Sequence, residues 1–211
     1  MLSPQFTTQR GLEVFDDFCV QVARHFQMSV VLDASERVVL VDERDSEIGI
    51  GAKLETHHRG ALHRAFSIFL FNQTGETLVQ RRALHKYHSG GKWANTCCGH
   101  PRPGEDICAA AERRLTEELG IKSKLQSSFL ARYRAVLDGE MIENEIVHVH
   151  FGRALEPATP NPDEASEVAF VSLEGLRDGT AFPRSEQTAW LLHYLDHHFD
   201  ELVAIRNRLM A

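Results

Sequence analysis

The stretch AFSIFLFNQTGETLVQRR, residues 65–82, constrains the fold more than any other part of the sequence. A continuous β-prone run is followed by a turn that contains glycine, and then by a second β-rich run. This order predicts a β-hairpin. The chain should therefore build its core around an antiparallel or mixed sheet.

The rest of the chain supplies further strands and three helices. We expect strands around 38–42, 47–51, 128–136, 143–153 and 168–173, and amphipathic helices over 11–27, 105–120 and 186–210. Residues 52–64 and 83–104 are expected to be loops, and the proline-rich residues 156–167 a surface segment. The order predicts an α+β fold, with a mixed or antiparallel sheet flanked by helices and with extra N-terminal and C-terminal helices. Residues 1–29 would form a helical extension and residues 30–211 a single catalytic domain.

Charge and composition exclude several classes of protein. The chain has 23 basic and 30 acidic residues, a net charge of −7, which argues against a general nucleic-acid-binding or membrane-surface role. No apolar run approaches the roughly 18 residues that span a bilayer, and no secretory signal precedes the first helix. The four cysteines lack the spacing of a secreted disulfide scaffold. We expect a cytoplasmic protein, monomeric or homodimeric, that acts on a small molecule.

Two carboxylates in the stretch IENEIVHVH indicate a cation site. Glu143 and Glu145 alternate on a predicted strand, so both side chains point to one face. Like charges that share an apolar face need a cation or exposure to water. With His57, His63 and His100 they could form a nitrogen and oxygen site for Mn²⁺, Zn²⁺ or Mg²⁺, although each residue alone could be an ordinary surface residue. His148 and His150 have the opposite parity and should be solvent-facing or satisfied core histidines.

The segment from Gly99 to Ile121 has a long and specific spacing. It follows the Nudix pattern of glycine, five residues, glutamate, seven residues, and then an Arg-Glu-apolar-x-Glu-Glu-x-Gly-apolar block, except that Arg114 stands where the pattern has glutamate. In Nudix proteins this segment presents carboxylates to diphosphate-bound Mg²⁺, and Glu118 retains that ability. Arg–Glu pairs at i,i+4 on an ordinary helix would explain the charges but not the glycine frame.

Four blocks in order carry a closer resemblance. LHRAFSIFLFN (62–72), NTCCGHP (95–101), the Nudix frame and ENE (143–145) together resemble the type 1 isopentenyl-diphosphate Δ-isomerases, a Nudix branch, over roughly residues 37–155. The resemblance implies that Cys98 is the catalytic thiol, that Glu145 acts in catalysis, and that Tyr133 lies near the active site. It also implies a family tryptophan position late in the chain, where GTAFPRSEQ offers Phe182.

The same resemblance implies two metal sites and a diphosphate site. His57, His63, His100, Glu143 and Glu145 would bind Mn²⁺, Mg²⁺ or Zn²⁺, and Glu118 with the Cys98 carbonyl would bind a Mg²⁺ that bridges to the diphosphate. Lys53, Arg82 and Lys86 would bind the diphosphate itself. The implied reaction is the isomerisation of isopentenyl diphosphate to dimethylallyl diphosphate in isoprenoid biosynthesis.

Two other functions are weighed against this one. A Nudix hydrolase of a nucleoside diphosphate derivative would need the carboxylate that Arg114 replaces. A non-catalytic metal-binding module could use Cys97, Cys98 and His100 as structural Zn²⁺ ligands, but the chain lacks the C-x-x-C spacing typical of such sites.

Overall fold

The computed structural model describes residues 36–211, so the predicted helix at 11–27 and the proposed extension 1–29 lie outside the described residues. The strands are β1 (Arg37–Val41), β2 (Glu47–Ala52), β3 (His63–Phe71), β4 (Thr77–Arg82), β5 (Trp93–Asn95), β6 (Cys97–Gly99), β7 (Gln126–Val136), β8 (Ile142–Arg153) and β9 (Ala165–Val171). The helices are α2 (Lys53–Arg59), α3 (Ile107–Leu119), α4 (Leu173–Asp178), α5 (Ala189–His197) and α6 (Phe199–Met210). Two short 3₁₀ segments cover Asp138–Glu140 and Arg184–Glu186.

Strand β3 lies at the centre of the sheet and has partners on both sides. It runs parallel to β8, in a register that joins His63 to Glu145 and continues to Phe71 opposite Arg153. On its other side it is antiparallel to β6, where Ser67 faces Cys98. The predicted turn after β3 is confirmed, but β3 meets β4 only at Phe71 and Thr77. Strand β4 instead pairs with β5 and β9, so the expected hairpin is splayed and the sheet is mixed.

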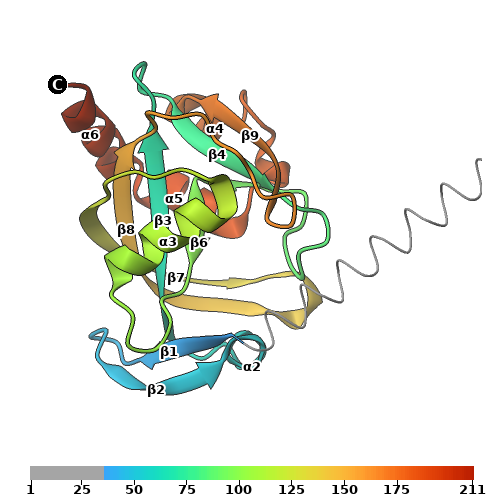
Figure 1. Ribbon diagram of the computed structural model, residues 1–211. Coiled ribbons are helices and arrows are strands. Elements are labelled where there is room, and N and C mark those ends of the chain that lie inside the picture. Colours follow the sequence, from blue (N-terminus) through green and yellow to red (C-terminus); the bar gives the residue numbers. More distant parts are fainter. Residues whose placement is uncertain (1–35) are drawn as a thin grey trace, which may run out of the picture.

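Alternate residues of β3 enter two different parts of the core. Phe66, Ile68 and Leu70 pack with α3, whereas Phe69 and Phe71 pack with the side chains of α4, α5 and α6. Because neighbouring residues of a strand point to opposite faces, this division places helices on both sides of the sheet. Figure 1 shows α3 in front of β3 and β8, with α5 behind them. The α+β prediction is confirmed.

The helix predicted over 105–120 is α3, which runs from Ile107 to Leu119. The side chain of Asp106 accepts a hydrogen bond from the backbone N–H of Ala109 and caps the first turn. Gly120 ends the helix in the left-handed conformation, with φ of 67°. Leu115 and Leu119 are buried in the apolar core, and Glu118 on the same helix is buried as well.

Several boundaries differ from the predictions. Residues 52–64, expected to be a loop, contain α2, and the expected loop 83–104 contains β5 and β6. The predicted helix over 186–210 is divided into α5 and α6 at His198, whose φ of −132° is not helical. Strand β9 begins at Ala165, inside the stretch expected to end at residue 167, because the whole of β9 pairs with β4.

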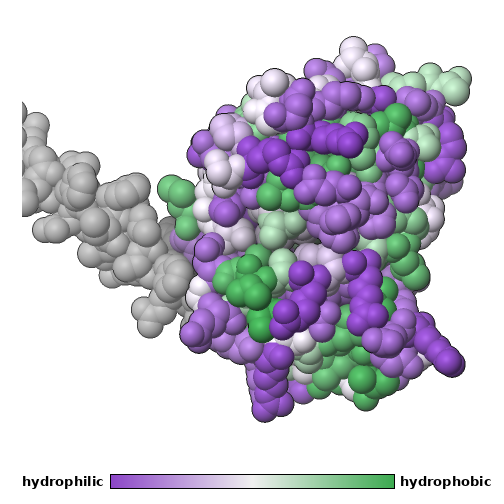
Figure 2. Space-filling view, turned by 180° about the vertical axis from the view of Figure 1, so that it is seen from behind, coloured by the Kyte–Doolittle hydropathy of each residue, from purple (hydrophilic) through white to green (hydrophobic). Residues whose placement is uncertain are grey.

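The face of the described domain that Figure 2 shows is predominantly polar. Seen from the side of α5 and α6, green apolar side chains form separate groups among purple polar ones (Figure 2). In residues 36–211, no helix has the length and apolar character needed to cross a membrane.

Candidate active site

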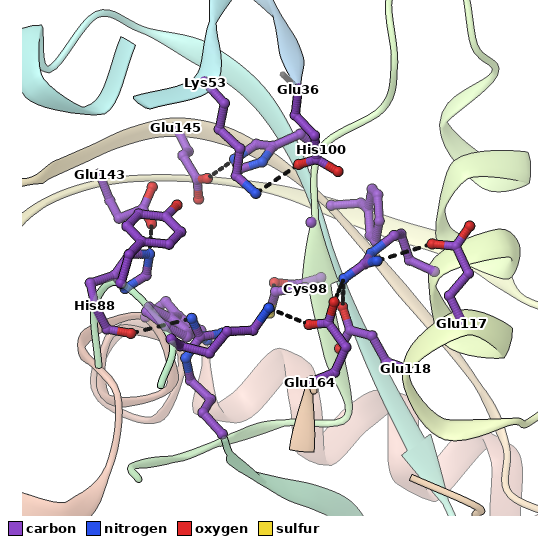
Figure 3. A pocket seen from close by; sticks show the side chains of 18 of the residues that line it. Glu36, Lys53, His88, Cys98, His100, Glu117, Glu118, Glu143, Glu145 and Glu164 are labelled. Carbon is purple, nitrogen blue, oxygen red and sulfur yellow. Dashed lines mark hydrogen bonds and ion pairs between the residues drawn. The ribbon is translucent and has the colours of Figure 1, made fainter. Parts of the chain in front are cut away.

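A cavity of about 590 Å³ lies where β3, β6, β7 and β8 meet α3 and α5. Nine of the predicted site residues line it, namely Lys53, Arg82, Lys86, Cys98, His100, Glu118, Tyr133, Glu143 and Glu145. His57 and His63 are fully buried. Figure 3 shows Cys98 between Glu143 and Glu145 on one side and Glu118 and Glu164 on the other.

Five predicted metal ligands are brought together at one end of this cavity. His57, His63, His100, Glu143 and Glu145 each offer one ligand atom, and these atoms all lie within 4.8 Å of one another. The β3–β8 register places His63 beside Glu145, with 3.4 Å between His63 Nε2 and Glu145 Oε1. His100, just after β6, brings its Nε2 to 2.8 Å from the same oxygen. Residues from α2, β3, β8 and the end of β6 therefore converge on one point.

The donor atoms of this cluster fit a divalent cation. His57 Nδ1 contacts the backbone oxygen of Lys53 at 2.7 Å, and His63 Nδ1 contacts that of Ala61 at 2.9 Å. If each Nδ1 donates its hydrogen to that oxygen, each Nε2 has a lone pair free for a metal. His57 Nε2 lies 3.1 Å from Glu143 Oε2, and both atoms are buried without a hydrogen-bond partner. Two facing lone pairs repel each other. The close approach of these two atoms therefore requires a proton or a cation that both of them bind.

The ionisation of the cluster reflects the same crowding. Burial alone would raise the pKa of Glu145, but hydrogen bonds and charge from His63, together with His57 and Tyr133, lower it. Burial and the neighbouring histidines hold the pKa of His100 well below its ordinary value. Glu145 is therefore a carboxylate and His100 a neutral imidazole at neutral pH, and both forms bind metals.

Three other histidines, which neighbour the ligands in sequence, lie outside the cluster. His58, next to His57 on α2, is exposed. His148 contacts Asp45 at 2.7 Å, and His150 is buried with its Nδ1 at 3.1 Å from the His148 carbonyl oxygen. Both are satisfied histidines outside the cluster, as their parity on β8 predicts.

The two adjacent cysteines point to opposite sides of β6. Cys97 is fully buried in the apolar core beside α3, whereas Cys98 lines the cavity. Burial raises the pKa of the Cys98 thiol to about 12, against hydrogen bonds with Ser67 and Asn95 that lower it. Cys98 is thus a protonated thiol at neutral pH. Because the two sulfurs face different sides of the sheet, they cannot ligate one Zn²⁺ ion.

The three predicted diphosphate-binding cations lie at the cavity wall, and the two lysines among them pair with carboxylates. Lys53 pairs with Glu36 at 2.8 Å, and Lys86 pairs with Glu164 at 2.6 Å. The Arg82 guanidinium donates to the His88 carbonyl at 3.3 Å. These pairs neutralise the local charge, and an anionic substrate would compete with the carboxylates for the same cations.

Arg114 occupies the Nudix carboxylate position and changes its chemistry. Its guanidinium contacts Glu118 at 2.5 Å and Glu164 at 3.2 Å. Gln80 also donates to Glu118, at 2.8 Å. The arginine places a positive charge where the Nudix pattern has a negative one, so fewer carboxylates remain for a metal on this side.

Sequence reasoning missed one aromatic residue of the cavity and offered another that does not line it. The ring of Phe182 stacks on Trp93, with centroids 3.8 Å apart, and Phe182 is not among the residues that line the cavity. Trp190 on α5 lines it instead, beside His88 at 5.8 Å between ring centroids. Trp190 lies within the amphipathic helix predicted over 186–210, and nothing in its helical spacing distinguishes a cavity position from a core position.

Comparison with known proteins agrees with this geometry. The profile of the NUDIX domain family matches residues 61–191. Isopentenyl-diphosphate Delta-isomerase 1 of Aromatoleum aromaticum is 52% identical over 142 residues, which cover 67% of this chain and 80% of that protein. Isopentenyl-diphosphate Delta-isomerase of Burkholderia multivorans is 46% identical over 155 residues, 74% of this chain and 88% of that protein. The crystal structure of DR0079 from Deinococcus radiodurans has the same fold, with a TM-score of 0.63, 20% identity, and coverage of 76% of this chain and 98% of that one.

Proposed function

Since the chain belongs to the isopentenyl-diphosphate Delta-isomerases of the NUDIX family, we infer that it interconverts isopentenyl diphosphate and dimethylallyl diphosphate. The observation that best supports this function is the joint placement of Cys98, Glu145 and the five-ligand cluster on one cavity. A hydrolase of the same fold has no need of a thiol opposite a carboxylate.

The isomerisation moves a double bond by two proton transfers. One proton adds to the terminal alkene carbon, and a different proton leaves the carbon on the other side of the resulting tertiary cation. An unactivated alkene is a weak base, so the protein must supply a well-aimed acid and a base. We assign these roles to Cys98 and Glu145 as a pair. Tyr133, opposite Glu145 in the β7–β8 ladder, would hold the carboxylate through its hydrogen bond.

The ion and the cations hold this chemistry in place. A divalent ion bound by His57, His63, His100, Glu143 and Glu145 would supply positive charge that offsets the two buried carboxylates. Lys53, Arg82 and Lys86 would bind the diphosphate, with a Mg²⁺ at Glu118 and the Cys98 carbonyl. The diphosphate keeps its bonds, and its binding positions the inert hydrocarbon.

Metal removal tests the proposed function directly. We expect the protein to convert isopentenyl diphosphate to dimethylallyl diphosphate in the presence of Mg²⁺, with the product observed by NMR. Dialysis against a strong chelator should abolish conversion, and added Mn²⁺ or Mg²⁺ should restore it. The reason is that the two buried carboxylates of the cluster need a cation beside them. Product formation that survives complete metal removal would contradict the cluster's role.

A second assay distinguishes the isomerase from the hydrolase alternative. Nucleoside diphosphate derivatives incubated with the protein and Mg²⁺ should release neither phosphate nor pyrophosphate, because Arg114 replaces a hydrolytic carboxylate. Hydrolysis of such a substrate faster than isomerisation would support the alternative instead.

The metal-binding module has no support from Cys97, which faces the core. A cytoplasmic location and a monomeric or homodimeric state stay predictions.

Trp190 should act on the cationic intermediate. A tryptophan face stabilises a desolvated cation more than a phenylalanine face does. We therefore expect Trp190→Phe to lower kcat by about three- to tenfold, for a loss of about 1 kcal/mol of cation–π interaction, with a smaller change in KM. Phe182→Leu, which alters the stack on Trp93 outside the cavity, serves as the control and should leave kcat unchanged. Equal kcat values for Trp190→Phe and the wild type would contradict this role.

A further inference from the structure

The candidate thiol and three buried polar side chains form a continuous hydrogen-bonded chain. The Tyr194 hydroxyl lies 2.9 Å from Ser67 Oγ, and Ser67 Oγ lies 3.2 Å from Cys98 Sγ. Cys98 Sγ is in turn 3.1 Å from Asn95 Oδ1. Tyr194 and Asn95 are fully buried and Ser67 is 2% exposed, so little water competes for these contacts.

The neighbours of the chain fix its direction. Asn95 Nδ2 donates to the carbonyl oxygens of Ile68 and Cys97 at 3.0 and 3.3 Å, which turns Oδ1 toward the sulfur as an acceptor. The thiol therefore donates to Asn95. Tyr194 donates to Ser67, which leaves the Ser67 hydrogen free to be donated to the sulfur. Each group then donates to the next, in the order Tyr194, Ser67, Cys98, Asn95.

The sheet register explains why the chain can form. Ser67 is a β3 residue of odd number, so its side chain lies on the α5 side, where Tyr194 packs edge-on to Phe69 with ring centroids 5.3 Å apart. Ser67 is also the direct β6 partner of Cys98. Ser67, the serine in the strand segment AFSIFLF, therefore contacts both the Tyr194 hydroxyl on α5 and the Cys98 sulfur.

We propose that Tyr194 and Ser67 are positioning residues, which hold the Cys98 sulfur at the angle at which it faces the bound alkene. The proposal rests on the proposed function, because it assumes that Cys98 transfers a proton. Ser67 and Cys98 line the cavity, whereas Asn95 and Tyr194 do not. The chain thus runs from the helix, through the cavity wall, to a buried amide, and fixes the side-chain torsion of a thiol that could otherwise rotate.

Three variants test the proposal. Tyr194→Phe and Ser67→Ala should each lower kcat by about tenfold, because a small misplacement of a reacting group costs this much or more, and KM should change by less than about twofold since neither group binds the diphosphate. The double variant should be no slower than Ser67→Ala alone, because the tyrosine acts through the serine. All rates are taken per folded molecule, as measured by circular dichroism.

Stability distinguishes positioning from simple core packing. Ser67→Ala leaves a buried Tyr194 hydroxyl without a partner, which destabilises the protein. The double variant removes both hydroxyls, so its melting temperature should recover toward the wild-type value while kcat stays low. A kcat that recovers together with the melting temperature would overturn the proposal, as would wild-type kcat in Tyr194→Phe.

A control and a reference variant complete the design. Thr77 Oγ1 on β4 is buried without a hydrogen-bond partner, so Thr77→Val removes a buried hydroxyl that has no connection to Cys98 and should leave kcat unchanged. Cys98→Ala separates the two levels of inference. If Cys98→Ala is active, the proposed role of the thiol fails. If Cys98→Ala is inactive and Ser67→Ala is fully active, the positioning inference alone fails.

Discussion

Replacing Cys98 by alanine is expected to lower kcat for isomerisation by about 10³-fold, within the range that a positioned acid or base contributes, while the protein stays folded. The sulfur lines the same cavity as Glu143 and Glu145, and Figure 3 shows Cys98 apart from these two carboxylates. Alanine fits the space without strain but cannot carry a proton. Its structural cost is limited to the lost contacts with Ser67 and Asn95, about 1–3 kcal/mol for buried groups left unpaired. The measurement is kcat by NMR, with folding followed by thermal unfolding.

The neighbouring cysteine gives a matched control. Cys97→Ala removes an equal sulfur from the core on the α3 side of β6, so it should lower the free energy of unfolding and leave kcat near the wild-type value. A Cys98→Ala variant that retains more than about a tenth of wild-type kcat would remove the thiol from the mechanism, since proton transfer by a positioned group is worth at least about 10²-fold.

Glu145→Gln should be as damaging, for two separate reasons. The substitution keeps the shape of the side chain but removes the charge that His63 and His100 face at 3.4 and 2.8 Å, so the metal cluster is weakened. It also removes the carboxylate that lies opposite Tyr133 in the β7–β8 ladder and lines the same cavity as Cys98. We expect kcat to fall by about 10³-fold or more, from the loss of proton transfer alone, even at saturating metal.

Glu143→Gln separates ligation from proton transfer. Glu143 contacts His57 at 3.1 Å and belongs to the same cluster, but we give it no proton to transfer. Its variant should bind Mn²⁺ more weakly and should recover a large part of its kcat at high metal concentration. Glu145→Gln should not recover. Equal rescue of both variants by metal would show that Glu145 is a ligand only, and the acid–base pair would have to be reassigned.

Local signals in the sequence predicted the elements with strong end signals. The helix over 105–120 ends at a glycine, and Gly120 does end α3, which Asp106 caps at its start. The seven-residue helix α2 was missed because KLETHHR spans barely two turns, which is too short for a periodic pattern. The division at His198 was missed because the apolar spacing continues across it. The parallel β3–β8 pairing joins residues about eighty positions apart, and no local pattern encodes such a contact.

The site residues that belong to a recognisable motif were predicted from the sequence. Those that are placed at the cavity only by packing were missed. His57, His63, His100, Glu143 and Glu145 converge as the ligand hypothesis requires. Trp190, Ser67 and Tyr194 lie in patterns that a plain apolar helix or strand would also produce, so their position at the cavity could not be read from spacing. Only the three-dimensional register shows which side of β3 each residue occupies.

The central strand also links correct folding to activity. His63 meets Glu145, and Ser67 meets Cys98, on two different neighbours of the same strand. A slip of one residue on β8 would set Asn144 or Ile146 opposite His63 and would turn both carboxylates into the apolar layer, where unpaired charge is costly. Molecules with a misaligned sheet would then be both unstable and inactive. The turnover per mole of purified protein should consequently report the yield of correctly folded chains, which makes the assay a sensitive quality test for refolded preparations.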